Sequence, residues 1–220
     1  GLFCARNDGV RRVAAPASAN KEAAKLTLDR RTLFRVFAII ALTTTLGSLI
    51  FQAITVSLPK VLEERLMDVA DSATEIGAWA FVVLAVASLA QILIGHLVDR
   101  YSIKWVFAAV AVLQVPACIL FIGITGVPVL VMSLVFMLLV FGQIPINDAL
   151  LSRITTSEYR SRIYGVKFVL SFAVSAAAVP LVALLHQTTG FDGLFTVMAV
   201  TAAIIAAAVL ALPRMRTVVA

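Results

Sequence analysis

The chain has 220 residues, of which 61% are hydrophobic and 14% are charged, with a formal net charge of +6. A soluble globular domain carries about 25% charged residues, so this composition excludes an ordinary soluble domain and indicates an integral membrane protein that contacts a lipid bilayer. No basic stretch alternates with aromatic residues on a soluble module, so the positive charge does not indicate a nucleic-acid partner.

Six apolar runs without Asp, Glu, Lys or Arg follow one another along the chain. Each is close to the ~20 residues that a helix needs to cross a bilayer. The runs are continuous and lack the period-two alternation of barrel strands, so they predict helices. We expect an all-α membrane protein in which six transmembrane helices form one bundle. The predicted spans are 36–58, 76–94, 105–124, 127–146, 168–185 and 194–212.

Basic residues predict the orientation of these spans. Alternate connections, together with the segment before the first span and the tail after the last, hold all but two of the 18 lysines and arginines. Cytoplasmic loops carry such an excess. We therefore expect residues 1–35 to be a basic cytoplasmic linker and residues 213–220 to be a cytoplasmic tail. Both termini then face the cytoplasm, and the plasma (inner) membrane is the expected location.

The connection between the second and third runs reads GHLVDRYSIK over residues 95–104. It resembles the conserved loop of the major facilitator superfamily of secondary transporters, whose general form is GxLaDrxGRk. Ser102 and Ile103 depart from that form. The residues that match it are Gly95, Leu97, Asp99, Arg100 and Lys104.

A second, less specific match lies in the fourth connection, where Arg160, Arg162 and Gly165 fit an R-x-R-x-x-G pattern. Together the two matches resemble the C-terminal six-helix half of such a transporter, over residues 21–216. Since the chain begins with Gly1, we expect the natural protein to continue upstream. The resemblance implies an N-terminal six-helix half as partner, with the two bundles rocking around a midplane site.

The same resemblance implies a cytoplasmic latch. Asp99 would face the positive N-terminal end of a helix in the other half. The start of the fifth span, with Arg162 and Gly165, would receive the equivalent aspartate in return. Gly95 would allow close packing of the second span. Positive-inside anchoring is the alternative role for Arg100 and Lys104.

In this family the first and fourth helices of each bundle line the cavity. Thr45, Ser48, Gln52 and Thr55 recur along one face of the first span. Near the end of the fourth span, Gln143 and Asn147 are four residues apart and share a face. We expect Thr45, Ser48, Gln52, Gln143 and Asn147 to line a solute cavity. Hydrogen bonding between helices is the alternative role for the polar stripe of the first span.

The spans hold no Asp, Glu, His, Lys or Arg at mid-depth, and the sequence has no metal-ligand spacing, so we expect no cofactor. They also lack the Ser and His, the paired Asp or the HExxH of intramembrane proteases, so we expect no enzyme. A neutral or amphiphilic small-molecule substrate is favoured, with or without ion coupling. The predicted function is solute transport by a permease or an efflux transporter. A stand-alone six-span channel or scaffold is the alternative.

Overall fold

The computed structural model describes residues 30–66, 72–155 and 158–212, and the regular structure of these residues is entirely helical. The predicted all-α fold is therefore confirmed for the described residues. Most of the predicted basic linker, and the whole predicted tail, lie outside them. The helices are α1 (Arg30–Arg65), α2 (Ala73–Ser88), α3 (Ala90–Arg100), α4 (Ile103–Leu120), α5 (Val127–Ile154) and α6 (Arg160–Leu210).

Five helical stretches in the described residues are long and apolar enough to cross a membrane. α2 and α3 form one of them, since Leu89 between them keeps helical dihedral angles. α6 has 51 residues, about 76 Å at 1.5 Å per residue, more than twice the hydrocarbon thickness of a bilayer. The predicted count of six spans therefore depends on how α6 is divided, and it stays a prediction.

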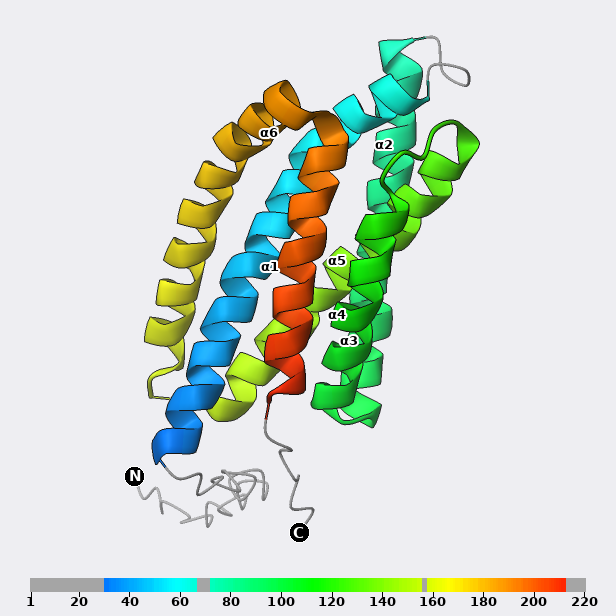
Figure 1. Ribbon diagram of the computed structural model, residues 1–220. Coiled ribbons are helices and arrows are strands. Elements are labelled where there is room, and N and C mark those ends of the chain that lie inside the picture. The colour runs from blue at the N-terminus through cyan, green and yellow to red at the C-terminus, as the bar shows by residue number, and fades with distance from the viewer. Residues whose placement is uncertain (1–29, 67–71, 156–157, 213–220) are drawn as a thin grey trace, which may run out of the picture.

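Gly190 breaks α6 into two arms. Its φ of 68° and ψ of −168° lie outside the helical region, in a conformation that is essentially restricted to glycine. The chain reverses there, so that residues 160–189 and 191–210 run in opposite directions (Figure 1). We call these the first arm and the second arm of α6.

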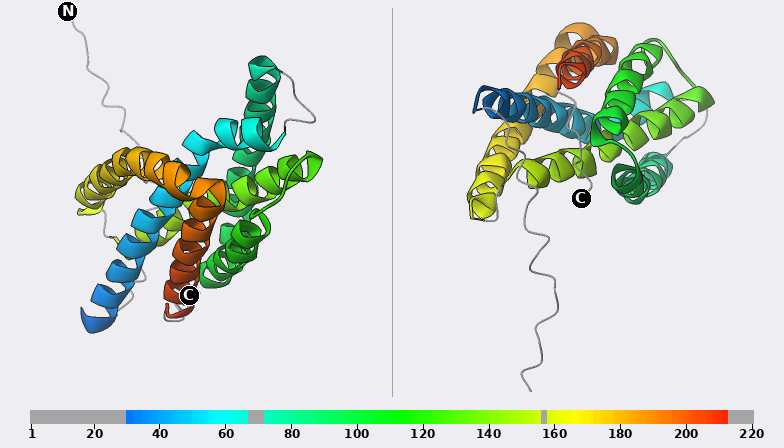
Figure 2. Two further views of the ribbon diagram at one scale, coloured as in Figure 1. Left: turned by 45° about the horizontal axis from the view of Figure 1, so that its top comes forward. Right: turned by 90° about the horizontal axis from the view of Figure 1, so that it is seen from below.

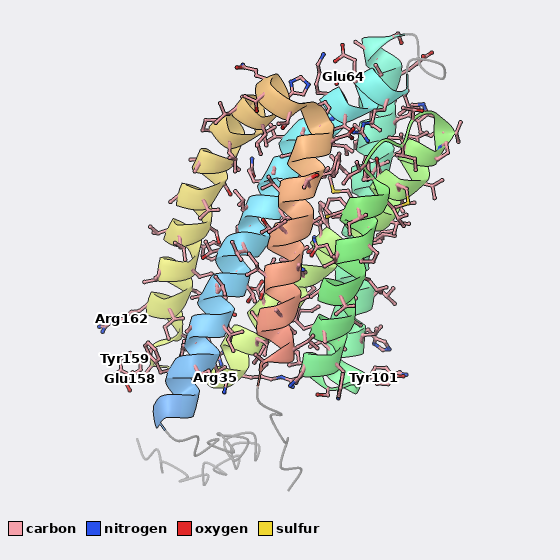
Figure 3. All side chains as sticks on the ribbon, in the orientation of Figure 1. Arg35, Glu64, Tyr101, Glu158, Tyr159 and Arg162 are labelled. Atoms are coloured by element: carbon pink, nitrogen blue, oxygen red, sulfur yellow. The ribbon has the colours of Figure 1, made fainter. Side chains whose placement is uncertain are left out.

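With α2 and α3 taken as one stretch and α6 as two arms, successive helical stretches run up and down the bundle, so that α1 begins and α6 finishes at the same end, the lower end in Figure 1. The connections from α3 to α4 and from α5 to α6, marked by Tyr101 and Glu158 in Figure 3, also lie there. Glu64 marks the upper end. The first arm of α6 lies at one edge of the bundle, beside α1 and away from α2 and α3 (Figure 2).

Arg65 joins three elements at the upper end. Its side chain is 9% exposed, and Nη2 lies 2.6 Å from Asp192 Oδ1 in the second arm of α6. Nη1 donates to the carbonyl of Phe121, and the guanidinium lies over the rings of Phe121 and Phe195 at 5.7 and 5.4 Å. Those rings stack with centroids 4.2 Å apart. A cation can be buried here because every face of it meets a carboxylate, a carbonyl or an aromatic ring.

At the lower end, two cations bind the carbonyl ends of helices. Lys104 Nζ donates to the carbonyls of Leu210 and Leu212, where α6 finishes. Arg153 Nη2 donates to the carbonyl of Val98 in the last turn of α3, at 3.3 Å. The last carbonyls of a helix have no partner within it, and they carry partial negative charge. Lys104, predicted as part of the latch or as an anchor, therefore fixes α4 to the end of α6.

Replacing Arg65 with Met should lower the free energy of unfolding by about 1–3 kcal/mol, because the carbonyls of Phe121 and Ile124 lose a charged hydrogen-bond donor, whereas Asp192, whose side chain is 54% exposed, can be hydrated. Lys60→Met is the matched control: Lys60 pairs with Glu63 at the surface, with both side chains about half exposed, and such pairs contribute about 0–1 kcal/mol. Unfolding of both variants in one detergent should be compared. Equal losses would contradict a structural role for Arg65.

Gly190→Ala should destabilise the bundle by about 1–3 kcal/mol, because alanine is strained in this backbone conformation. Gly77 is the control, since it lies in α2 and a Cβ added there meets no atom within 4 Å. Gly77→Ala should be neutral or slightly stabilising. Thermal unfolding of the two variants measures the difference. If Gly190→Ala leaves the unfolding temperature unchanged, the turn at residue 190 forms without glycine.

Candidate functional site

A cavity of about 320 Å³ lies between α1, α5 and the first arm of α6. Its α1 residues range from Thr44 to Gln52, around the centre of the predicted span 36–58. Four predicted residues line it together: Ser48, Gln52, Gln143 and Asn147. The other lining residues are Thr44, Gly47, Phe51, Val140, Ile144, Lys167, Phe168, Ser171, Phe172 and Ser175.

Thr45, the fifth predicted residue, does not line the cavity. Its Oγ1 donates to the carbonyl of Ala41 at 2.7 Å, and Thr55 of the same stripe does the same to Phe51. A hydroxyl that bonds the preceding helical turn is already satisfied. Thr44, which was not predicted, is buried and lies against the cavity instead.

Gln143 is fixed by a second buried amide. Its Nε2 donates to Gln114 Oε1 of α4 at 2.6 Å, and the two side chains are 4% and 0% exposed. Its own Oε1 lies toward α1, where a Cβ at Gly47 would approach it to 3.2 Å. Gly47 thus leaves room for an amide oxygen next to the cavity. Gln114 does not line the cavity itself, and it supports Gln143 from behind.

Two further contacts link the helices around the cavity. Ser48 Oγ of α1 donates to Ser171 Oγ of the first arm at 3.1 Å. Thr43 Oγ1 donates to Asn147 Oδ1 at 3.5 Å, which places the amide of Asn147 against α1. Gln52, in contrast, makes no hydrogen bond within the described part of the chain, although it lines the cavity. A polar side chain left open in this way can bind water or a solute.

Lys167 is the only charged residue among the described residues that line the cavity. The predicted spans placed it in a connection, but α6 begins at Arg160, so Lys167 lies in the second turn of the helix. Its Nζ forms an ion pair with the Asp148 carboxylate of α5. Lys167, Ser171 and Ser175 are spaced by four residues, and this helical stripe is the sequence signal that could have identified them.

The predicted latch residues lie apart from this cavity, at the lower end. Asp99 and Arg100 are exposed in the last turn of α3, and within the described residues Asp99 has no ion-pair or hydrogen-bond partner. Arg162 is exposed and projects outward from the first arm of α6 (Figure 3). A Cβ at Gly95 or Gly165 would meet no described atom within 4 Å. The close neighbour expected for Gly95 is therefore not found in the described part of this bundle.

Apolar helices that are long enough to cross a membrane, packed around a mainly apolar cavity with a few hydroxyl, amide and ammonium groups, are those of an integral membrane protein. The family model of the Major Facilitator Superfamily matches residues 33–219. The chain therefore belongs to the major facilitator superfamily, a family of solute transporters, and the resemblance inferred from GHLVDRYSIK is confirmed. No curated protein and no solved structure matches the chain.

Gln143→Leu should destabilise the bundle by about 1–3 kcal/mol, because it leaves the buried Gln114 without its hydrogen bond. The double variant Gln114→Leu/Gln143→Leu should recover most of this loss, since both polar groups are removed together. Unfolding of the two single variants and of the double variant forms the required cycle. Additive losses would mean that the two amides are not coupled.

Proposed function

We propose that this chain is the C-terminal six-span bundle of a solute transporter that works by alternating access. The cavity between α1, α5 and the first arm of α6 is then its share of the solute path. The main support is that Gln52 lines the cavity, near the centre of the predicted span 36–58, without forming a hydrogen bond to any described residue. An amide at this depth costs free energy unless water or a solute binds it.

The shape of α6 supports six spans. Each arm is about the length of one membrane crossing, with Gly190 at the turn. Two arms that cross in opposite directions bring the end of α6 to the end where α1 begins (Figure 1). A single crossing would leave more than half of an apolar 51-residue helix outside the bilayer.

The charges support the proposed orientation. At the lower end, α3 to α6 carry Arg100, Lys104, Arg153, Arg160, Arg162 and Lys167. The upper end has Lys60 and Arg65, alongside Glu63, Glu64 and Asp192. By the positive-inside rule, the proposed cytoplasmic side is the lower end. The plasma (inner) membrane is the proposed location.

Alternating access needs a second bundle and a contact that changes between the two states. Asp99 is exposed and free among the described residues, and the helix surface at Gly165 is open. These features fit a latch between two six-helix halves, in which each half offers a carboxylate to a helix start of the other.

The proposal is tested by the accessibility of a cysteine at residue 48. Ser48→Cys, in the natural full-length protein with Cys4 and Cys118 replaced, should react with a membrane-impermeant thiol reagent added from either face. Adding Asp99→Asn should raise the rate from the cytoplasmic face and lower it from the other, because the cytoplasmic latch is lost. Reaction rates in sided vesicles measure both effects.

Ser133→Cys is the matched control, because Ser133 is buried in α5 at 1% exposure and does not line the cavity. It should stay unreactive from both faces. If the cysteine at residue 48 is unreactive from both faces, the cavity is not a solute path. If it reacts from both faces but Asp99→Asn changes neither rate, a channel is favoured over alternating access.

A further inference from the structure

Lys167 gives the cavity a positive charge that the sequence did not predict. Its side chain is 16% exposed and lines the cavity directly. An ammonium in such a place is stable only when an anion or another electron-rich group faces it. The groups that face the Lys167 ammonium therefore bear on which ligand charge the cavity favours.

The nearest such group is the Asp148 carboxylate, which forms the ion pair with Nζ. Asp148 is itself 42% exposed and does not line the cavity. The ammonium also lies 5.7 and 5.9 Å from the ring centroids of Tyr164 and Phe168. Lys167 thus pairs with an exposed carboxylate that lies outside the lining, while the lysine itself belongs to the lining, where an anion in the cavity can compete for it.

The rest of the lining describes the body of such a ligand. Phe51, Phe168 and Phe172 supply apolar aromatic surface, and Thr44, Ser48, Gln52, Ser171 and Ser175 supply neutral hydroxyl and amide groups. None of the described lining residues carries a negative charge. A cation would meet Lys167 without a lining counter-charge, whereas an organic anion would have its charge compensated.

We propose that Lys167 is the substrate-binding cation of the cavity and that the transported solute is a small organic anion with an apolar or aromatic body. This inference rests on the proposed transport function and names the substrate class for that site. In the empty cavity, Asp148 holds Lys167. When the solute enters, its carboxylate or similar anionic group competes with Asp148 for the ammonium. The neutral or amphiphilic solute expected from the sequence is thereby replaced by an amphiphilic anion.

The test uses benzoate, benzamide and benzylamine, which share one ring and differ in charge. The natural full-length protein in detergent is heated with increasing amounts of each probe, and the rise in unfolding temperature gives an apparent Kd. Benzoate should stabilise the protein more than benzamide or benzylamine. Lys167→Gln should raise the apparent Kd for benzoate by about tenfold or more, the factor expected for one charge-assisted hydrogen bond. The apparent Kd for benzamide should stay unchanged.

Asp148→Asn is the matched variant, because it breaks the same ion pair from the other side. If Lys167 binds the solute, Asp148→Asn removes its competitor, and benzoate should bind several-fold more tightly. A purely structural ion pair predicts that the two variants change benzoate binding in the same direction, which would overturn the inference. So would an equal effect of the three probes on the natural protein, or a preference for benzylamine.

The inference and the proposed function can fail separately. A cysteine at residue 48 that responds to Asp99→Asn, together with no preference for benzoate, would remove the anion inference and leave the transport proposal standing. An unreactive cysteine at residue 48 would remove the solute path itself, whatever Lys167 binds.

Discussion

Hydrocarbon offers no hydrogen-bond partner, so every polar group that this chain carries into the bilayer must find one within the protein or in a water-filled cavity. This constraint accounts for most side-chain contacts at membrane depth. Ser57 and Thr201 bond carbonyls of their own helices, and Gln114 and Gln143 bond each other. Gln114 Nε2 and Ser133 Oγ are buried without a hydrogen-bond partner among the described residues. The open amide of Gln52 differs from them because it lies in the cavity.

The charged side chains at the two ends of the bundle make different kinds of contact. At the upper end, the buried side chain of Arg65 contacts the exposed Asp192 and the buried rings of Phe121 and Phe195, which connects α1, the end of α4 and the second arm of α6. At the lower end, Lys104 and Arg153 bind single helix ends, and Asp99 is exposed. The upper contacts are therefore internal and mutually dependent, whereas the lower end keeps charged groups available for another surface.

The sequence predicted the all-helical fold because a crossing helix must be mostly apolar over about 20 residues, while the count of six spans stays a prediction. It predicted Gln143 and Asn147 at the cavity because residues four apart share a face. Thr45 was selected by the same rule, but it lies about 100° around the helix from Thr44, and its hydroxyl bonds its own backbone. Lys167 was missed because a charge at the edge of an apolar run looks like a connection. Only the start of α6 at Arg160 shows that it lies inside a helix.

The first arm of α6 is attached to its neighbours by polar contacts at three depths. These are Lys167 with Asp148 near the lower end, Ser171 with Ser48 at the cavity, and His186 with Glu64 at the upper end, 2.9 Å apart. The arm lies at the edge of the bundle (Figure 2), and much of its apolar surface is exposed, as at Val169 and Phe172. Ala178 and Val182 add buried apolar packing to these polar contacts. The first arm is thus anchored along its whole length at the edge of the bundle, and it continues into the second arm only through the turn at Gly190.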